Sequence, residues 1–142
     1  MIIPDLNVLV YAHVSGSRHH AVARSWWEDL LSGHDQVGIA GPVALGFVRL
    51  TTGRRVLSSP LTVDQALDVV DSWLDQPNAD YLADSAAIFH RACELIRSVG
   101  TAGNLTTDAQ IAATAIEFSA VVATNDADFS RFPGVRTVNP LR

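Results

Sequence analysis

The hydrophobic positions along the chain follow two patterns, one typical of buried strands and one of amphipathic helices. Short apolar runs predict strands at residues 1–3, 37–40 and 120–123. Longer segments repeat apolar residues three or four positions apart and predict helices over 6–14, 20–31, 42–52, 64–74, 84–99 and 107–119. Thr62 suits the N-cap of the helix at 64–74, and Gly100 ends the helix at 84–99. Strands that alternate with helices predict an α/β fold, with a central parallel sheet covered by helices on both faces.

Length and composition agree with one globular domain over residues 1–142, which is long enough to bury a single core. Hydrophobic residues make up 48% of the chain and the mean hydropathy is +0.18, yet no apolar run approaches the roughly 18 residues of a membrane span. The first residues lack the positive segment of a signal peptide. Cys93 is the only cysteine, which excludes disulfides within the chain and cysteine-based zinc sites. We therefore expect a cytoplasmic protein.

Charge narrows the chemistry further. All ten basic residues are arginines, so every mechanism that requires a lysine is excluded, including Schiff bases and Walker phosphate loops. The net charge is −5 at pH 7, so the molecule as a whole does not present a field that attracts nucleic acid.

Acidic residues follow predicted strands or open a predicted helix at three separate places. Asp5 directly follows the first strand, Asp126 and Asp128 follow the strand at 120–123, and Asp108 lies at the front of the helix at 107–119. Ligand sites of parallel sheets gather beyond the carboxyl ends of the strands. Parallel topology can therefore bring these four carboxylates together.

Each acid also has a purely structural interpretation. Asp5 could cap the helix that follows it. Asp108 lies inside a segment in which Thr107 and Gln110 match a capping box, and an acid in the first turn also complements the helix dipole. Asp126 and Asp128 could be turn residues.

Several carboxylates within a few Å of one another repel unless a cation lies between them. Mg²⁺ and Mn²⁺ prefer oxygen ligands, and Mg²⁺ commonly shares its coordination sphere with phosphate oxygens. Phosphodiester hydrolysis uses such ions to activate water and to neutralise charge on the phosphate. A phosphatase with an aspartyl nucleophile is disfavoured, because Asn7 stands where its second Asp would be and the chain has no Lys.

Two segments resemble a known family. The stretch MIIPDLNVLVYA at 1–12 resembles the opening of PIN domains, and TTDAQIAATAIEFSAVVATNDADFSRF at 106–132 resembles their distal half. In order, spacing and total length, the whole chain resembles the VapC-type ribonuclease toxins of bacterial toxin–antitoxin pairs.

The resemblance implies a PIN-like three-layer α/β/α fold and a Mg²⁺- or Mn²⁺-dependent endoribonuclease. It also implies a homodimer and a VapB-type antitoxin as the inhibiting partner. Asp5, Asp108 and Asp126 would be catalytic and metal-binding, and Asp128 would be a further catalytic member or a turn residue beside them. Asn7 and Asn125 would orient the carboxylates or waters.

The RNA-binding residues are less evident. Arg49, Arg54 and Arg55 cluster around the end of the helix at 42–52. They suit either the helix dipole or contacts with RNA phosphates.

The chain departs from the family pattern at Gly46, and this departure bears on the number of metal ions and on whether the protein cleaves RNA. PIN domains usually carry a Glu early in the helix at 42–52, and in PVALGFVRLTT Gly46 stands in that place. No other acid lies between Asp35 and Asp64. This argues for one metal ion, or for a second ion that binds only together with the substrate phosphate. It also keeps open a degenerate PIN domain that binds RNA or an antitoxin and cleaves nothing.

Overall fold

A computed structural model describes all 142 residues. Its strands form one five-stranded sheet in the order β3-β2-β1-β4-β5, and every neighbouring pair is parallel. The strands are β1 (Ile2–Pro4), β2 (Val37–Ala40), β3 (Ala79–Leu82), β4 (Val121–Ala123) and β5 (Arg136–Val138). The predicted parallel sheet is confirmed, and its carboxyl ends all lie along one edge.

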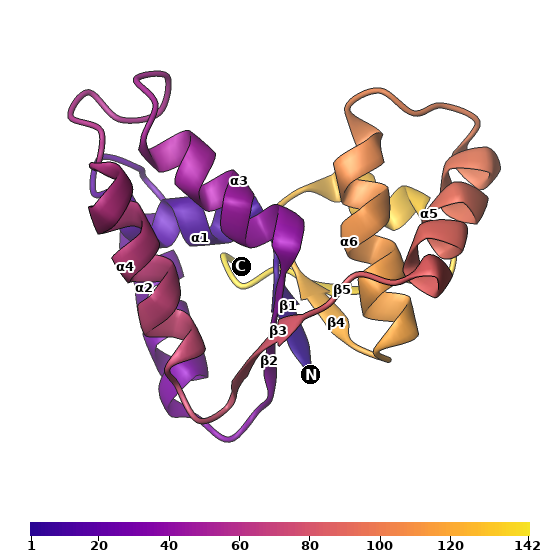
Figure 1. Ribbon diagram of the computed structural model, residues 1–142, viewed down its shortest axis with the longest axis horizontal. Coiled ribbons are helices and arrows are strands. Elements are labelled where there is room, and N and C mark those ends of the chain that lie inside the picture. The colour runs from indigo at the N-terminus through magenta and orange to yellow at the C-terminus, as the bar shows by residue number, and fades with distance from the viewer.

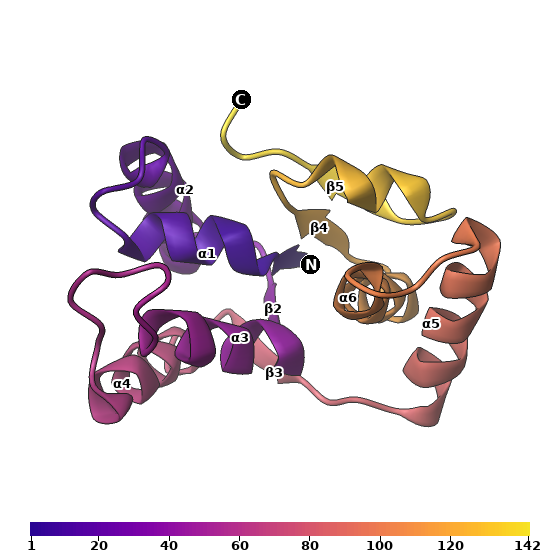
Figure 2. The same cartoon turned by 90° about the horizontal axis from the view of Figure 1, so that it is seen from above.

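Helices cover both faces of this sheet. They are α1 (Leu6–His13), α2 (His20–Ser32), α3 (Gly41–Thr51), α4 (Val63–Leu74), α5 (Ala86–Val99) and α6 (Leu105–Glu117), with a short 3₁₀ helix η1 (Ala127–Arg131). Figures 1 and 2 show α1 to α4 on one side of the sheet and α5 and α6 on the other, which confirms the three-layer α/β/α architecture. No helix combines the length and the apolar character that crossing a membrane requires.

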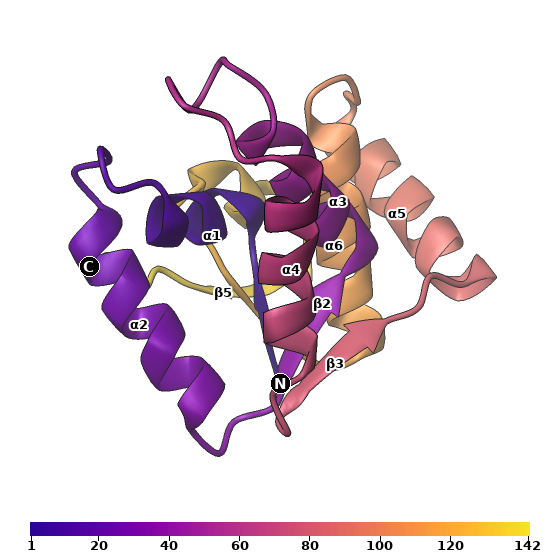
Figure 3. The same ribbon diagram turned by 60° about the vertical axis from the view of Figure 1, so that its left-hand side comes forward.

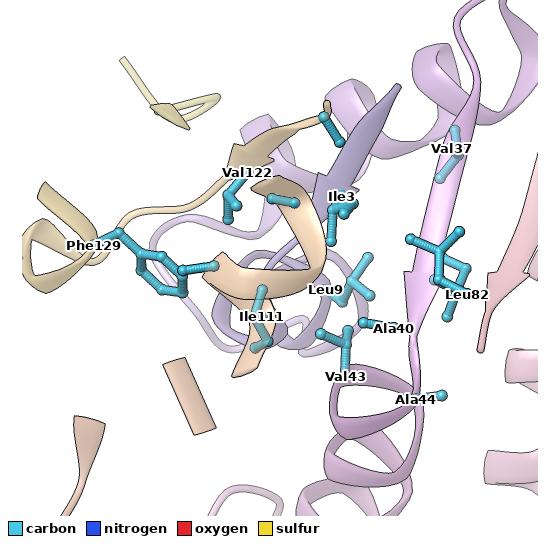
Figure 4. Packing of buried hydrophobic residues seen from close by; sticks show 14 of the residues in the cluster. Ile3, Leu9, Val37, Ala40, Val43, Ala44, Leu82, Ile111, Val122 and Phe129 are labelled. Atoms are coloured by element: carbon cyan, nitrogen blue, oxygen red, sulfur yellow. The ribbon is translucent and has the colours of Figure 1, made fainter. Parts of the chain in front are cut away.

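The core lies between the central strands and the two helical layers. Ile3 and Val122, on the neighbouring strands β1 and β4, are fully buried. Leu9 packs on them from α1 and Ile111 from α6, as Figure 4 shows. Fully burying a side chain of this size contributes about 1.5–3 kcal/mol, so the central strands are fixed in place by the layers on both sides.

The helix ends confirm two sequence predictions and contradict a third. Thr62 caps α4 in a capping box with Gln65, and Gly100 ends α5 with a left-handed φ of 82°. The predicted capping box of Thr107 and Gln110 is wrong, because α6 begins at Leu105. Thr107 therefore lies inside the first turn, where its backbone is helical and cannot serve as an N-cap.

The sequence did not predict the two edge strands, β3 and β5 (Figure 3). In β3 the middle residues Asp80 and Tyr81 are exposed, and all three residues of β5 are exposed. Edge strands bury little of their surface, so they lack the apolar runs that revealed β2 and β4.

Candidate functional site

The sheet pairing brings the acids after β1 and β4 to adjacent places. Pro4 of β1 pairs with Ala123 of β4, and the backbone N–H of Asp5 donates to the Ala123 carbonyl at 2.8 Å. Asp5 therefore lies beside the segment that carries Asp126. The predicted convergence of these two acids follows directly from the strand register.

Asp5 is held by both of its carboxylate oxygens. Oδ1 accepts a hydrogen bond from the backbone N–H of Leu6 at 2.7 Å, so Asp5 does cap α1. Oδ2 accepts from the Thr124 hydroxyl at 2.7 Å. The side chain is only 5% exposed, and this burial raises the pKa of Asp5 although the two hydrogen bonds oppose the change. The capping interpretation of Asp5 is thus confirmed, and its part in a metal site stays a prediction.

Thr124 connects two of the acids, a role that the sequence interpretation did not assign. Its hydroxyl donates to Asp5 and accepts from the backbone N–H of Asp126 at 2.9 Å. The residue is buried at the end of β4. A hydroxyl residue placed directly between a buried strand and the acids was the available signal.

The pKa of Asp108 reflects the charges of the other acids. Its pKa is raised to about 6, first by burial and then by repulsion from Asp5, Asp126 and Asp128. Repulsion of this kind requires the carboxylates to be near one another. Asp5, Asp126 and Asp128 thus lie near enough to Asp108 to act on its pKa.

The remaining two acids differ in their surroundings. Asp126 Oδ1 accepts from the backbone N–H of Asp128 at 2.9 Å and caps η1, which confirms the turn interpretation for Asp126. Asp128 is exposed, and its carboxylate lies 3.8 Å from the Arg131 guanidinium. Asp126 thus has one oxygen committed to the turn, and Asp128 lies at the outer margin of the group.

The chemistry of this donor set fits a hard divalent cation. The four aspartates offer only carboxylate oxygens as ligands, and Mg²⁺ and Mn²⁺ favour oxygen donors. The side chains as they stand do not form a ready-made group of three ligands, so the single-cation geometry stays a prediction. A cation would reduce the repulsion between carboxylates that raises the pKa of Asp108.

The side chains of the two asparagines near the acids make no hydrogen bond to the four carboxylates, and their role in orienting water stays a prediction. Asn125 Oδ1 accepts from the Asn139 amide at 2.9 Å. Asn7 Oδ1 is buried without a hydrogen-bond partner. Thr124 instead donates to the Asp5 carboxylate.

The arginines proposed for RNA contact lie at the far end of α3. Arg49 belongs to the last turn of that helix, and Arg54 and Arg55 follow it; all three are exposed. Gly41 opens α3 at the carboxyl edge of the sheet, so Arg49 lies about 12 Å along the helix axis from that edge. The structure does not bring these arginines into the acidic group.

Gly46 is closely packed against Leu6. It is buried on the side of α3 that faces α1, and a Cβ added there would lie 2.7 Å from Cδ2 of Leu6. A glutamate at this position would require Leu6 to move. The glycine therefore has a packing reason in this chain, independent of any metal.

Comparison with known proteins supports the architecture along the full length. The PIN domain family model matches residues 2–135. Ribonuclease VapC33 of Mycobacterium tuberculosis is 42% identical over 142 residues, which is 100% of this chain and 99% of that protein. Ribonuclease VapC37 of the same organism is 39% identical, covering 99% of this chain and 97% of that protein.

Solved structures agree in fold. VapBC2 from Rickettsia felis, bound to a DNA fragment from its promoter, matches with a TM-score of 0.70 at 23% identity, covering 98% of each chain. Mycobacterium tuberculosis VapC20, a toxin that cleaves the sarcin–ricin loop, matches with a TM-score of 0.70 at 19% identity, covering 96% of this chain and 99% of that one. The chain belongs to the PIN domain family and, within that family, to the VapC group.

Proposed function

We propose that this protein is an endoribonuclease toxin that hydrolyses RNA with Mg²⁺ or Mn²⁺ at the acidic group beyond the carboxyl edge of its sheet. The observation that carries the proposal is the pairing of β1 with β4, which places Asp5 beside the segment of Asp126 through the Thr124 hydroxyl, with Asp108 near enough for these carboxylates to raise its pKa. Repulsion among acids is unfavourable for the fold unless a cation compensates it. The ribonuclease names of full-length relatives at 42% and 39% identity support the choice of RNA as the substrate.

Asp5, Asp108 and Asp126 are the residues that would hold the ion. When bound, a divalent ion neutralises charge that develops on the phosphate and makes nearby water more acidic. Gly46 contributes no ligand, so one ion is expected rather than two.

The chain's own residues have distinct tasks in this proposal. The Leu6 N–H and the Thr124 hydroxyl fix both oxygens of Asp5, so this ligand is preorganised. Asp108 lies beside the other acids, where its carboxylate would accept the proton of the attacking water. As water attacks phosphorus, its proton passes to Asp108. The bond from phosphorus to the 3′ oxygen breaks, and that oxygen takes up a proton. The products carry a 5′-phosphate and a 3′-hydroxyl.

A VapB-type antitoxin is the proposed partner. Structural relatives of this chain include VapBC complexes from Rickettsia felis and Haemophilus influenzae. The homodimer stays a prediction. Helix α1 and Trp27 offer a dimer little apolar surface, because they lie largely inside the molecule and Trp27 is 3% exposed. Sedimentation velocity at micromolar concentration measures the state directly, and a monodisperse monomer would contradict the dimer.

The alternative is a degenerate PIN domain that binds RNA or antitoxin without cleaving. The observation that favours it is the absence of a ready-made three-ligand group, together with Gly46 at the place of a family glutamate. Such a protein would bind RNA equally well with and without a functional acidic group.

A cleavage assay with matched variants separates these functions. The wild-type protein should cut single-stranded or looped RNA in Mg²⁺ or Mn²⁺ and stop in excess chelator. Asp5→Asn and Asp108→Asn should abolish cutting, while Asp71→Asn, the same change on an exposed position of α4, should not. A 2′,3′-cyclic phosphate product, or cutting that persists in chelator, would contradict the proposed chemistry. No cutting in any metal would favour the degenerate domain.

A further inference from the structure

A cavity of about 280 Å³ opens at the same edge of the sheet as the acids, but outside their group. Its walls come from the ends of β2 and β3, from the start of α3 and from α6. Leu45 and Tyr81 contribute apolar surface, and Asp84, Gln110 and Thr114 contribute polar groups. At this volume it stands at the lower end of small-molecule pockets, which measure about 300–1,000 Å³, so it suits one small planar group.

The strand register fixes how far this cavity lies from the acids. Ile2 pairs with Val37, so counting along both strands places Asp5 opposite Ala40, and Ala40 pairs with Leu82. Ala40 and Leu82 both line the cavity. Figure 4 shows Ala40 where β2 runs into α3. Neighbouring strands are about 4.8 Å apart, so the backbone of Ala40 lies about one strand spacing from that of Asp5, and the backbone of Leu82 lies about two.

The Tyr81 side chain lies across the start of α3. The Tyr81 hydroxyl lies 2.8 Å from the position that a Cβ on Gly41 would occupy. Only a glycine at the start of α3 lets the ring extend across this helix end. The ring is 57% exposed and offers an aromatic surface at the mouth of the cavity.

The polar groups at the cavity are free to bind a ligand. Gln110 is not engaged in a capping box, and the only hydrogen bond at this residue outside the helix backbone is to its carbonyl, from the Thr114 hydroxyl at 2.8 Å. Asp84 Oδ1 accepts from the backbone N–H of Ser85 at 2.9 Å, which leaves its other oxygen unpartnered. Asp84 does not contribute to the raised pKa of Asp108. It is therefore a separate negative charge, distinct from the acidic group.

We propose that this cavity binds one nucleobase of the RNA, adjacent to the phosphate held at the acids, and selects bases that carry an exocyclic amino group. The inference rests on the proposed function and names part of its substrate recognition. The carboxylate of Asp84 repels phosphate, so the base and not the backbone enters. Tyr81 supplies the stacking surface on which bases bind irrespective of sequence.

The direction of selectivity follows from the donors and acceptors. Adenine, cytosine and guanine each present an amino group that a carboxylate or an amide oxygen accepts. Uracil has no amino group, and the carbonyl oxygens on both sides of its single N3–H donor face the Asp84 charge unfavourably. The Gln110 amide can pair with a base edge through both its oxygen and its nitrogen. Adenine, cytosine and guanine should therefore be preferred over uracil at one position beside the cut.

The test compares wild-type protein with Asp84→Asn and Gln110→Leu, and uses Asp71→Asn as the control. A pool of random RNA is cut in Mg²⁺ or Mn²⁺ and the ends are sequenced. Separately, binding of short A-rich and U-rich oligonucleotides is measured by fluorescence anisotropy in chelator. The wild type should discriminate against uracil by about fivefold or more at one position. Asp84→Asn should bind all RNA more tightly, because a negative charge is lost, and should reduce this discrimination, because the new amide can donate to the carbonyl oxygens of uracil as well as accept from an amino group. Gln110→Leu should weaken it, and Asp71→Asn should preserve it.

The outcomes separate this inference from the proposed function. Absence of cutting with the uracil discrimination intact in chelator would overturn the function and keep the binding site. Cutting with a base profile that neither variant alters would overturn the binding site and keep the function. A wild-type protein that binds no RNA would overturn it as well. So would variants that change the sedimentation coefficient and reduce cutting equally at all bases, because the surface would then lie between two copies of the chain.

Discussion

At the scale of single residues, Thr124 has the largest structural effect for its size. Its hydroxyl satisfies one oxygen of the buried Asp5 and the backbone N–H of Asp126. Thr124→Val preserves the shape but leaves a buried carboxylate oxygen without a donor, which costs about 1–3 kcal/mol. We expect urea unfolding to show a loss of that size for Thr124→Val and a much smaller loss for Thr124→Ser. Equal losses in both variants would show that the methyl group, and not the hydroxyl, is what matters.

The raised pKa of Asp108 predicts how the stability of the fold changes with pH. Its folded-state pKa is raised from 3.8 to about 6, so the folded state holds this proton more tightly than the unfolded state does. The contribution of this group to stability is therefore most favourable below about pH 4 and is lost as the pH rises through 6. Because the group is about half exposed to solvent, we expect the loss to be only about 1 kcal/mol.

Asp108→Asn removes this titration. In chelator, the variant should be more stable than the wild type at pH 7.5 by about 1 kcal/mol, and the difference should vanish at pH 4. Urea unfolding at both pH values measures it. A variant that is less stable at pH 7.5 would mean that the Asp108 carboxylate makes a favourable contact in the fold, contrary to the repulsion argued here.

At the scale of secondary-structure elements, the sequence predicted the helices and strands whose apolar side chains are buried in the core. All six helices and three of the strands produce apolar periods, and the caps at Thr62 and Gly100 have unambiguous chemistry. The edge strands β3 and β5 carry almost no apolar pattern. The supposed capping box at Thr107 failed because the motif does not fix where a helix begins, and α6 gains two residues at its start.

The acidic site was predictable to a similar extent. The four acids could be identified because each follows a strand or opens a helix in a parallel topology. The sequence offered only a weak signal for Thr124, a hydroxyl residue between a buried strand and the acids, and none for the cavity beside β2. Their roles depend on which strands are neighbours, and the chain order does not determine the sheet order β3-β2-β1-β4-β5.

The packing of α1 against α3 gives a prediction at the element scale. A Cβ on Gly46 would lie 2.7 Å from the end of the Leu6 side chain. Alanine within a helix is favoured over glycine by about 1 kcal/mol, but here the new methyl group must displace Leu6. We expect Gly46→Ala to stabilise the protein in a Leu6→Ala background and to give less benefit, or a loss, in the wild type. A double-mutant cycle should show a coupling of about 1 kcal/mol, and strict additivity would contradict the contact.

At the scale of the whole molecule, the acids form a concentrated negative charge in a chain whose net charge is already −5. An ion that binds the folded state and not the unfolded chain stabilises the fold by mass action, by about 2.7 kcal/mol at one hundred times its dissociation constant. Millimolar Mg²⁺ or Mn²⁺ should therefore raise the melting temperature by several degrees. K⁺ at matched ionic strength should raise it less, because screening alone does not need a defined site.

The variants decide whether this stabilisation comes from the site. Asp5→Asn and Asp126→Asn should each remove most of the shift caused by the divalent ion, since a neutral amide is a weaker ligand of the same shape. Asp71→Asn should leave the shift intact, because it changes the net charge by the same amount far from the acids. If all three variants reduced the shift equally, the ions would be acting on the overall charge and the single-cation site would be wrong. If only the first two did, the binding of the ion would be assigned to the carboxylates that β1 and β4 carry to the edge of the sheet, by a measurement that does not depend on cleavage.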